Sequence, residues 1–384
     1  MRIPGFTSTG SKRPELLFGA ADGVPIRMMR SEGCTVWDEE GRPFIDTVMA
    51  LGAVALGYAH PAVVEATAAA LRTGGTGPLA PVEEERVAER LCAVLPGAEA
   101  VRFLKTGAEA VAAAVRIARV HTGRDRVVTC GYHGWLDWCQ AEGGVPEVVR
   151  DLRTEIPFND RAGLEAALAM GSDVAAVVVE PVIDGAPSLD WLEALRTQTK
   201  TTGAVLVFDE IKTAFRIAVG GAAERWNVVP DLMVVGKALG NGMPIAAVTG
   251  ERDLMDAVTR TWVSSTLATE SLGLAAAAAV LDTYDREPVI DRLRQAGQRL
   301  FDTLAALVAR FPTVAANVRG LPEMCYLELT KPELSAALAQ AAAQCGLLFK
   351  RDAYNYVSWA HTDEVLLEVS ARLNEAMEEV VGRC

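Results

Sequence analysis

Several chemically active side chains follow apolar runs of this 384-residue sequence, at the points where buried strands would end. A glycine-containing turn over residues 105–109 follows one run, and an aromatic segment over residues 131–135 follows the next. Asp209 and Lys237 follow two later runs. In open parallel sheets, ligands bind beyond the carboxyl ends of the strands. The sequence therefore predicts one sheet edge that gathers a phosphate cradle, an aromatic platform, a carboxylate and a primary amine.

Pyridoxal phosphate is the cofactor that needs this set of groups. Its aldehyde forms a Schiff base with a lysine, its ring nitrogen stays protonated beside a carboxylate, and its phosphate binds at a helix N-terminus. Among the seven lysines, Lys237 alone combines a post-strand position with flanking glycines, at 236, 240 and 242, that allow close approach. We therefore expect Lys237 to carry the cofactor and Asp209 to lie beside its ring nitrogen.

The elements that must position these residues are short apolar runs alternating with helical patterns. The runs are continuous, which is typical of strands in a parallel sheet covered on both faces. Ser188 and Gly203 are start and stop signals for one intervening helix. The predicted strands are Val101–Leu104, Arg126–Cys130, Val174–Val179, Ala204–Phe208 and Leu232–Val235, and the predicted helices are Ala108–Val120, Arg161–Met170 and Ser188–Lys200. The fold class is therefore α/β, with a mostly parallel sheet.

The two ends of the chain differ from this middle part. We interpret residues 1–50 and 286–384 as one smaller α+β lobe beside a large domain over residues 51–285. The C-terminal part shows long helical patterns with short strands between them. Residues 330–333 (TKPE) have the spacing of a capping box, which predicts the start of a helix there.

Composition excludes several classes of protein. With 37 Lys+Arg against 50 Asp+Glu, the formal net charge is −13, which argues against binding to nucleic acid or an anionic membrane. The longest apolar stretches fall short of the roughly 18–20 residues of a membrane span. Seven scattered cysteines with no CxxC pair and only four histidines disfavour a disulfide framework and a metal centre. Since no signal-peptide pattern opens the sequence, we expect a cytoplasmic protein without a metal.

Five linked motifs carry a resemblance to a known family. VFDEIKTAFR followed by PDLMVVGKALGNGMP resembles the signature of class III aminotransferases of fold type I, in which an aspartate and the Schiff-base lysine bracket such a segment. RFLKTGAEAVAAAVRIARVHTGRDRVV and GYHGWLDW resemble the phosphate turn and stacking aromatic of that family. CTVWDEEGRPFIDTVMALGAVALGYAHPAVVEA and YVSWAHTDE resemble the branch that contains glutamate-1-semialdehyde aminomutase and related bacterial aminotransferases. The resemblance covers nearly the whole chain.

The resemblance implies roles for individual residues. Lys237 would be the Schiff-base lysine, and Asp209 would pair with the pyridinium nitrogen. Thr266 would reach the cofactor phosphate across the interface of a homodimer with shared active sites. The other implied cofactor contacts are the phosphate turn Thr106, Gly107 and Ala108, the stacking ring of Tyr132, Ile211 on the opposite ring face, and Glu180 nearby.

The departures from the family pattern concern both the phosphate and the substrate. The turn reads Lys-Thr-Gly-Ala at 105–108 where the family usually has Asn-Ser-Gly-Thr, and Thr-Glu-Ser stands at 269–271 where many members have Gly-Asn-Pro. Glu270 either stabilises a helix N-terminus or contacts the substrate. His133 is a substrate contact or a hydrogen-bonded structural residue, and Trp135 is a further substrate candidate. Lys212 is an ion-pair residue or a neighbour of the active site.

These observations predict a pyridoxal-phosphate enzyme that moves an amino group from a small-molecule donor to the aldehyde or ketone of a small metabolite. Few lysines, many arginines and abundant alanine suggest a GC-rich bacterial gene and hence specialised metabolism. An intramolecular aminomutase of the glutamate-1-semialdehyde type, or a racemase or epimerase, is the alternative within the same chemistry. A non-catalytic dimeric homologue is the alternative from another class.

Overall fold

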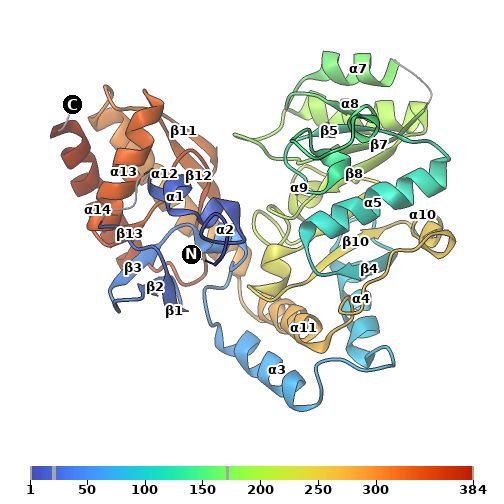
Figure 1. Ribbon diagram of the computed structural model, residues 1–384, viewed down its shortest axis with the longest axis horizontal. Helices are drawn as coiled ribbons and strands as arrows, with labels where there is room; N and C mark the ends of the chain where they lie inside the picture. Colours follow the sequence, from blue (N-terminus) through green and yellow to red (C-terminus); the bar gives the residue numbers. More distant parts are fainter. Residues whose placement is uncertain (1, 20–22, 170–172, 383–384) are drawn as a thin grey trace. The chain divides into compact units, whose positions relative to one another are not determined.

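The computed structural model describes residues 2–19, 23–169 and 173–382 (Figure 1). The chain forms two compact units. One unit is Pro61–Ile290, and the other combines the described residues of Met1–His60 and Asp291–Cys384. The boundaries between the units therefore lie at residues 60 and 290 of the sequence, whereas we expected these boundaries at residues 50 and 285.

The unit Pro61–Ile290 is built on a sheet whose seven described strands have the order β4-β10-β9-β8-β7-β5-β6. Neighbouring strands from β9 to β6 are parallel, whereas β10 runs antiparallel to both β4 and β9. All five predicted strands are present, and β6 and β10 are additions that the apolar pattern did not predict. The strands are β4 (Ala100–Leu104), β5 (Arg126–Cys130), β6 (Arg153–Glu155), β7 (Val174–Val179), β8 (Val205–Asp209), β9 (Leu232–Val235) and β10 (Ala246–Gly250).

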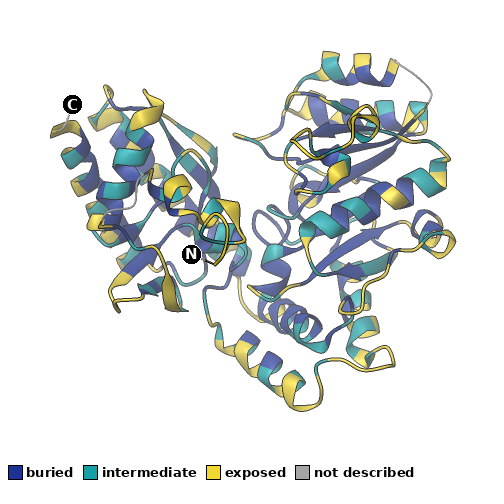
Figure 2. Ribbon diagram, viewed as in Figure 1, coloured by how far each residue is buried: buried dark blue, intermediate teal, exposed yellow. Residues whose placement is uncertain are grey.

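Both faces of this sheet are covered. Successive residues of a strand point to opposite faces, and every residue of β7, β8 and β9 is buried, as the dark blue strands of Figure 2 show. Helix α5 (Gly107–Thr122) packs on one face, where its apolar side shares a core with Val178, Val207 and Val234. The predicted α/β class with a mostly parallel sheet is confirmed.

Local signals set the limits of the helices that border the sheet edge. α5 begins after the N-cap Thr106 and ends at Gly123, whose φ of +67° suits glycine. α8 (Leu189–Thr202) begins after Ser188, whose hydroxyl accepts a hydrogen bond from the Trp191 amide at 3.2 Å. These N-cap residues lie in turns that connect a strand to a helix. They therefore determine where the helix N-termini face the sheet edge.

The remaining helices of this unit surround the sheet. α3 packs along α11. For α7, the predicted end at Met170 lies outside the described residues. The α-helices are α3 (Pro61–Arg72), α4 (Val82–Val94), α6 (Glu147–Arg150), α7 (Arg161–Ala169), α9 (Gly221–Arg225), α10 (Arg252–Met255) and α11 (Ser271–Arg286), and the 3-10 helices are η2 (Asp137–Cys139), η3 (Lys237–Gly240) and η4 (Asp256–Arg260).

The other unit joins the two ends of the chain. Its sheets have the orders β1-β2-β3-β13 and β11-β12-β14, and β13 pairs in parallel with β3, so that Leu347 lies opposite Ile45. The capping box predicted at residues 330–333 is wrong, because the N-cap of α13 is Lys331 and no side chain caps the helix. The strands are β1 (Met28–Glu32), β2 (Thr35–Asp38), β3 (Pro43–Asp46), β11 (Ala315–Leu321), β12 (Met324–Leu329), β13 (Leu347–Leu348) and β14 (Asn355–Tyr356). The helices are η1 (Gly10–Lys12), α1 (Pro14–Phe18), α2 (Met49–Gly52), α12 (Val289–Arg310), α13 (Pro332–Gln344) and α14 (Asp363–Gly382).

None of the helices in the described ranges combines the length and the apolar composition that crossing a bilayer requires.

Candidate active site

A cavity of about 310 Å³ lies at the carboxyl ends of the strands in Pro61–Ile290. Residues one or two positions after β4, β5, β7 and β9 contribute to its wall, together with the last residue of β8. The predicted site residues that line it are Gly107, Ala108, Tyr132, His133, Trp135, Glu180, Asp209, Ile211 and Lys237. A second cavity of about 270 Å³, within the other unit, has mostly apolar walls and holds none of the predicted site residues. The chemistry predicted from the sequence therefore gathers in one place.

Lys237 opens η3, immediately after Gly236 and strand β9. Its backbone has a φ of +45°, a conformation that costs energy for a residue with a side chain and that often marks functional sites. Burial, and after it the positive charge of Lys212, lowers the pKa of the Lys237 ammonium to about 8. A larger fraction of the amine is therefore neutral near pH 7 than for an exposed lysine. A neutral amine can act as a nucleophile and as a base.

Asp209 ends β8, and its carboxylate is held by two hydrogen-bond partners. His133 Nδ1 lies 2.9 Å from Asp209 Oδ2, and the Ile211 amide donates to Asp209 Oδ1 at 3.2 Å. The side chains of His133 and Asp209 are both buried, and the imidazole of His133 stacks on Trp138 with ring centroids 6.2 Å apart. The histidine therefore fixes the orientation of the carboxylate. Of the two roles that the sequence left open for His133, this contact is that of a hydrogen-bonded structural residue.

Glu180 follows β7 and connects the aromatic segment with a second lysine. Its Oε2 accepts from the Tyr132 amide at 3.0 Å, and its Oε1 pairs with Lys212 Nζ at 2.7 Å. The rings of Tyr132 and Trp135 are 67% and 74% exposed although both line the cavity, so their faces are open to a ligand. Lys212 lines the same cavity, which makes it both an ion-pair residue and a neighbour of the site.

The phosphate turn presents two open amides. Thr106 and Glu109 form a capping box, in which Glu109 Oε2 accepts from the Thr106 amide at 2.9 Å and the Thr106 hydroxyl accepts from the Glu109 amide at 3.2 Å. Within the described residues, the amides of Gly107 and Ala108 have no acceptor. A Cβ at Gly107 would lie 2.4 Å from Ile211 Cδ1, so a larger residue there would displace the Ile211 side chain.

These groups fit pyridoxal phosphate. The two open amides at the N-terminus of α5 suit a phosphate. The Lys237 amine suits an aldehyde, and the Asp209 carboxylate suits a protonated ring nitrogen. Among the described residues, no three His, Cys, Asp or Glu side chains gather as a metal ion would require.

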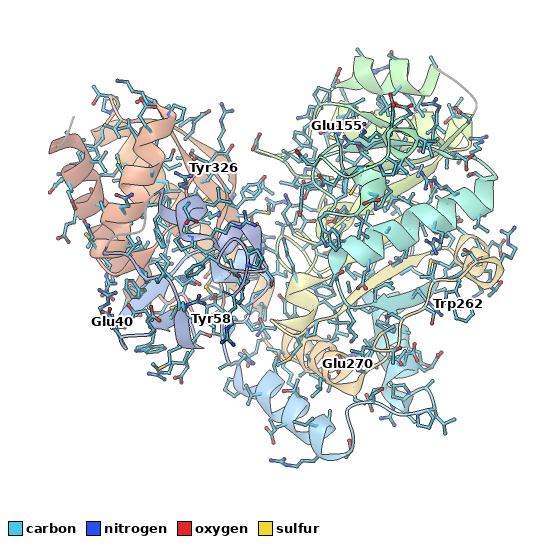
Figure 3. All side chains as sticks on the ribbon, in the orientation of Figure 1. Glu40, Tyr58, Glu155, Trp262, Glu270 and Tyr326 are labelled. Atoms are coloured by element: carbon cyan, nitrogen blue, oxygen red, sulfur yellow. The ribbon has the colours of Figure 1, made fainter. Side chains whose placement is uncertain are left out.

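Three predicted site residues do not line the cavity. The Thr106 hydroxyl is engaged in the capping box. Thr266 is exposed in the loop before α11. The same loop carries Trp262, which is labelled in Figure 3 and is 79% exposed. Glu270 is the N-cap of α11 and is only 8% exposed. Of its two predicted roles, the contacts of Glu270 are those of a residue that stabilises a helix N-terminus.

The sequence analysis missed Lys105 as a cavity residue, together with the segment Met243–Ile245. The available signal for Lys105 was its place directly after a strand, beside the phosphate turn. The available signal for Met243–Ile245 was the preceding Gly-Asn-Gly, since such a turn brings the following residues back toward the sheet edge.

Comparison with known proteins identifies the family. The family described as "Aminotransferase class-III" matches residues 19–379. The chain belongs to the class III aminotransferases. It is accordingly a pyridoxal-phosphate-dependent enzyme with the fold type I architecture, as the sequence motifs predicted. Class III aminotransferases act on an amino donor and a carbonyl acceptor.

Individual relatives of this class III aminotransferase cover almost its whole length. Glutamate-1-semialdehyde 2,1-aminomutase of Neisseria gonorrhoeae (strain NCCP11945) is 33% identical over 407 aligned residues, which cover 96% of this chain and 94% of the relative. The enzyme of the same name from Thermomicrobium roseum is 32% identical over 421 aligned residues, with 98% and 96% covered. The solved structure of the FumI protein of Sphingopyxis sp. MTA144, in its PLP internal aldimine form, superposes with a TM-score of 0.94 at 26% identity, with 99% of this chain and 94% of that chain covered.

Proposed function

We propose that this class III enzyme transfers an amino group from a small-molecule donor to the aldehyde or ketone of a small metabolite. The observation that carries the proposal is the cavity whose wall includes Lys237, Asp209 and the phosphate turn at Gly107 and Ala108. A buried amine with a lowered pKa beside a fixed carboxylate is an arrangement for moving protons.

The residues divide the work between binding and proton transfer. Pyridoxal phosphate, when bound, supplies an aldehyde and an electron-withdrawing ring. Gly107 and Ala108 would hold its phosphate, and Asp209, oriented by His133, would keep a proton at its ring nitrogen. Lys237 Nζ would bind the aldehyde carbon and later accept and return the proton of the substrate carbon.

Contacts on the two ring faces complete the proposed site. The exposed ring of Tyr132 would stack on one face of the cofactor ring, and Ile211 would pack against the other. Glu180 would hold Tyr132 in place through the Tyr132 amide. Trp135, exposed at the cavity wall, would contact the substrate.

An intramolecular 2,1-aminomutase is the second candidate function. It is favoured by the names of the curated relatives, which are 32–33% identical over nearly the full chain. The two candidates differ in one requirement, because a mutase needs no external amino donor. A racemase or epimerase shares that property but leaves the amino group on the same carbon.

We also propose that the working enzyme is a homodimer in which Thr266 completes the site of the partner copy. Thr266 lies outside the cavity of its own chain, and the neighbouring Leu267 and Trp262 are 53% and 79% exposed. Exposed large apolar side chains beside a functional residue are typical of a contact surface. For the compartment we propose the cytoplasm, since the six described cysteines are all unbridged.

The test is a half-reaction on the purified protein loaded with pyridoxal phosphate. For an aminotransferase, an amino donor alone converts the bound cofactor to its amine form, which the absorption spectrum reports, and a carbonyl acceptor then restores it. For the mutase, glutamate 1-semialdehyde alone gives an isomeric product. If no donor in a broad amine and amino-acid screen changes the spectrum while the single-substrate isomerisation proceeds, aminotransfer is refuted.

A further inference from the structure

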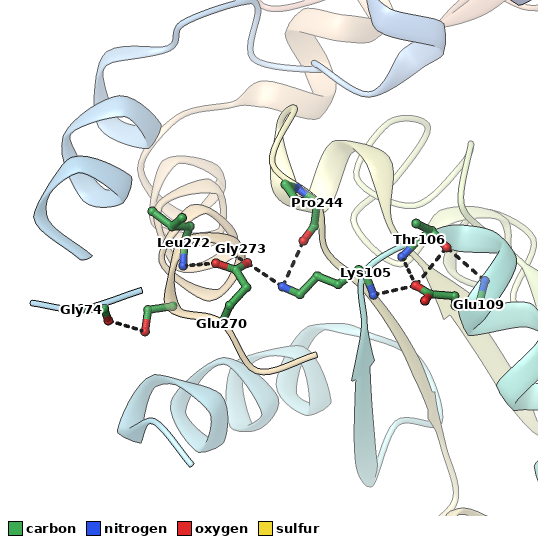
Figure 4. A network of polar contacts seen from close by, with 9 residues as sticks. Gly74, Lys105, Thr106, Glu109, Pro244, Glu270, Leu272 and Gly273 are labelled. Carbon is green, nitrogen blue, oxygen red and sulfur yellow. Dashed lines mark hydrogen bonds and ion pairs between the residues drawn. The ribbon is translucent and has the colours of Figure 1, made fainter. Parts of the chain in front are cut away.

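Lys105 makes an ion pair that connects the phosphate turn with the start of another helix. It lies between the end of β4 and the N-cap of α5. Its Nζ lies 2.6 Å from Glu270 Oε1 and donates to the Pro244 carbonyl at 3.1 Å (Figure 4). The two charged side chains are only 13% and 11% exposed. Water therefore screens this pair far less than it screens a surface ion pair.

Glu270 uses the same carboxylate to cap α11. Its Oε2 accepts from the Leu272 amide and its Oε1 accepts from the Gly273 amide, each at 2.7 Å. Gly273 makes this arrangement possible, because a Cβ there would lie 2.7 Å from Glu270 Oε1 and 3.0 Å from Lys105 Nζ. The carboxylate is thus fixed by backbone donors before it meets the lysine, which makes it a rigid anchor.

The two residues are both departures from the usual family pattern, one in the phosphate turn and one after the interface threonine. The structure shows that the two departures contact each other. In the phosphate turn, the Glu109 carboxylate accepts hydrogen bonds from the amides of Lys105 and Thr106. The amides of Gly107 and Ala108 are therefore left for a ligand. The position of these two amides depends on where the turn is held. The Lys105 side chain ties that turn to Glu270.

We propose that Lys105 and Glu270 act as a pair of positioning residues that set the phosphate-binding amides of α5 and join them to the segment carrying Thr266. This inference rests on the proposed cofactor site. It assigns Glu270 a mechanical role in phosphate recognition, although the residue carries the same sign of charge as a phosphate.

A purely electrostatic role makes a different prediction. If the pair acted only through its charges, removing the Lys105 cation would weaken phosphate binding, whereas removing the Glu270 anion would strengthen it. As a positioning pair, each residue alone is needed, so both single substitutions weaken binding. The sign of the Glu270 effect therefore separates the two explanations.

The experiment compares pyridoxal phosphate with pyridoxal, which lacks the phosphate, as probes of the full-length protein after its cofactor has been removed. The variants are Lys105→Met, Glu270→Gln and the double substitution; glutamine retains one of the two oxygens that cap α11. Each single variant should lose at least about tenfold in affinity for pyridoxal phosphate and keep its affinity for pyridoxal. The double variant should lose no more affinity for pyridoxal phosphate than the single variant that binds it more weakly, since the two residues act as one unit.

Asp282→Asn is the matched control, because it removes a different ion pair of α11, the one with Arg90. It should bind both probes like the unchanged protein. A Glu270→Gln variant that binds pyridoxal phosphate as tightly as the unchanged protein or more tightly overturns the positioning role. Equal losses for both probes also overturn it. If the unchanged protein binds neither probe, the proposed function itself fails, and this result is distinct from the other two.

Discussion

The two ends of the cavity are held together in different ways. Asp209 and Lys237 lie at or just after the ends of the adjacent strands β8 and β9. The hydrogen-bond partners of Asp209, which are His133 and Ile211, also follow strands of the same sheet. At the phosphate end, Lys105 and Glu270 are 165 positions apart in the sequence and come from turns that lead into two helices. Strand ends therefore place the main residues of the ring end, whereas at the phosphate end a side-chain ion pair ties the turn after β4 to the start of α11. Substitutions at the first should affect the chemical step, and substitutions at the second should affect cofactor retention.

The largest effect is expected at the ring end. Asp209→Asn keeps the hydrogen-bonding shape toward His133 and Ile211 but removes the negative charge. We expect kcat to fall by at least about 100-fold while the cofactor still binds. Steady-state kinetics with absorption spectra measure both quantities. Asp231→Asn is the control, because Asp231 contacts the other end of the same strand through the Leu206 amide. Near-normal turnover of Asp209→Asn would remove the aspartate from the mechanism.

A smaller effect at the same end concerns the pH dependence. Burial and the Lys212 charge lower the pKa of Lys237 to about 8, and Lys237 must be neutral to accept a proton. Lys212→Met removes one cation and leaves Glu180 to favour the charged amine, so both changes raise the pKa of Lys237. The acidic limb of kcat against pH should move upward by about one unit. The exposed Lys200→Met is the control, and an unmoved limb would contradict this role of Lys212.

The smallest effect is expected at the phosphate end, in stability. Gly273→Ala places a Cβ 2.9 Å from the Pro244 carbonyl oxygen and 2.7 Å from Glu270 Oε1. The free energy of unfolding should fall by about 1–3 kcal/mol, as for other overpacked sites. Urea denaturation of the two variants Gly273→Ala and Gly77→Ala measures it, since a Cβ at Gly77 meets nothing within 4 Å. Equal stability of the two variants would show that the close approach at Gly273 is not tight.

The contrast between the two ends also explains what the sequence could predict. The strands are nearly continuous apolar runs, so the residues that follow them were placed at one edge without knowledge of the structure. The predicted N-cap Ser188 is a local signal that depends on one or two neighbours. The antiparallel strand β10 was missed, because Ala246–Gly250 is short, rich in small residues and ends in glycine.

The contacts between turns that are distant in the sequence could not be predicted from a local sequence pattern. Lys105 and Glu270 each stood out as a departure from the family pattern, but nothing in the sequence indicates that two particular residues meet. The same holds for His133 and Asp209, whose contact joins the segment after β5 to the last residue of β8 across the buried strand β7. Side-chain pairing across a sheet edge is set by the packing of the whole unit. It therefore becomes visible only in the structure.

We propose that Lys237 carries the cofactor in the cavity that it shares with Asp209. The most direct test is to load the purified protein with pyridoxal phosphate, reduce it with borohydride and map the labelled peptide by mass spectrometry. We expect one label per chain, on Lys237. A label on Lys212 or Lys105 instead, or a label spread over several lysines, would contradict it.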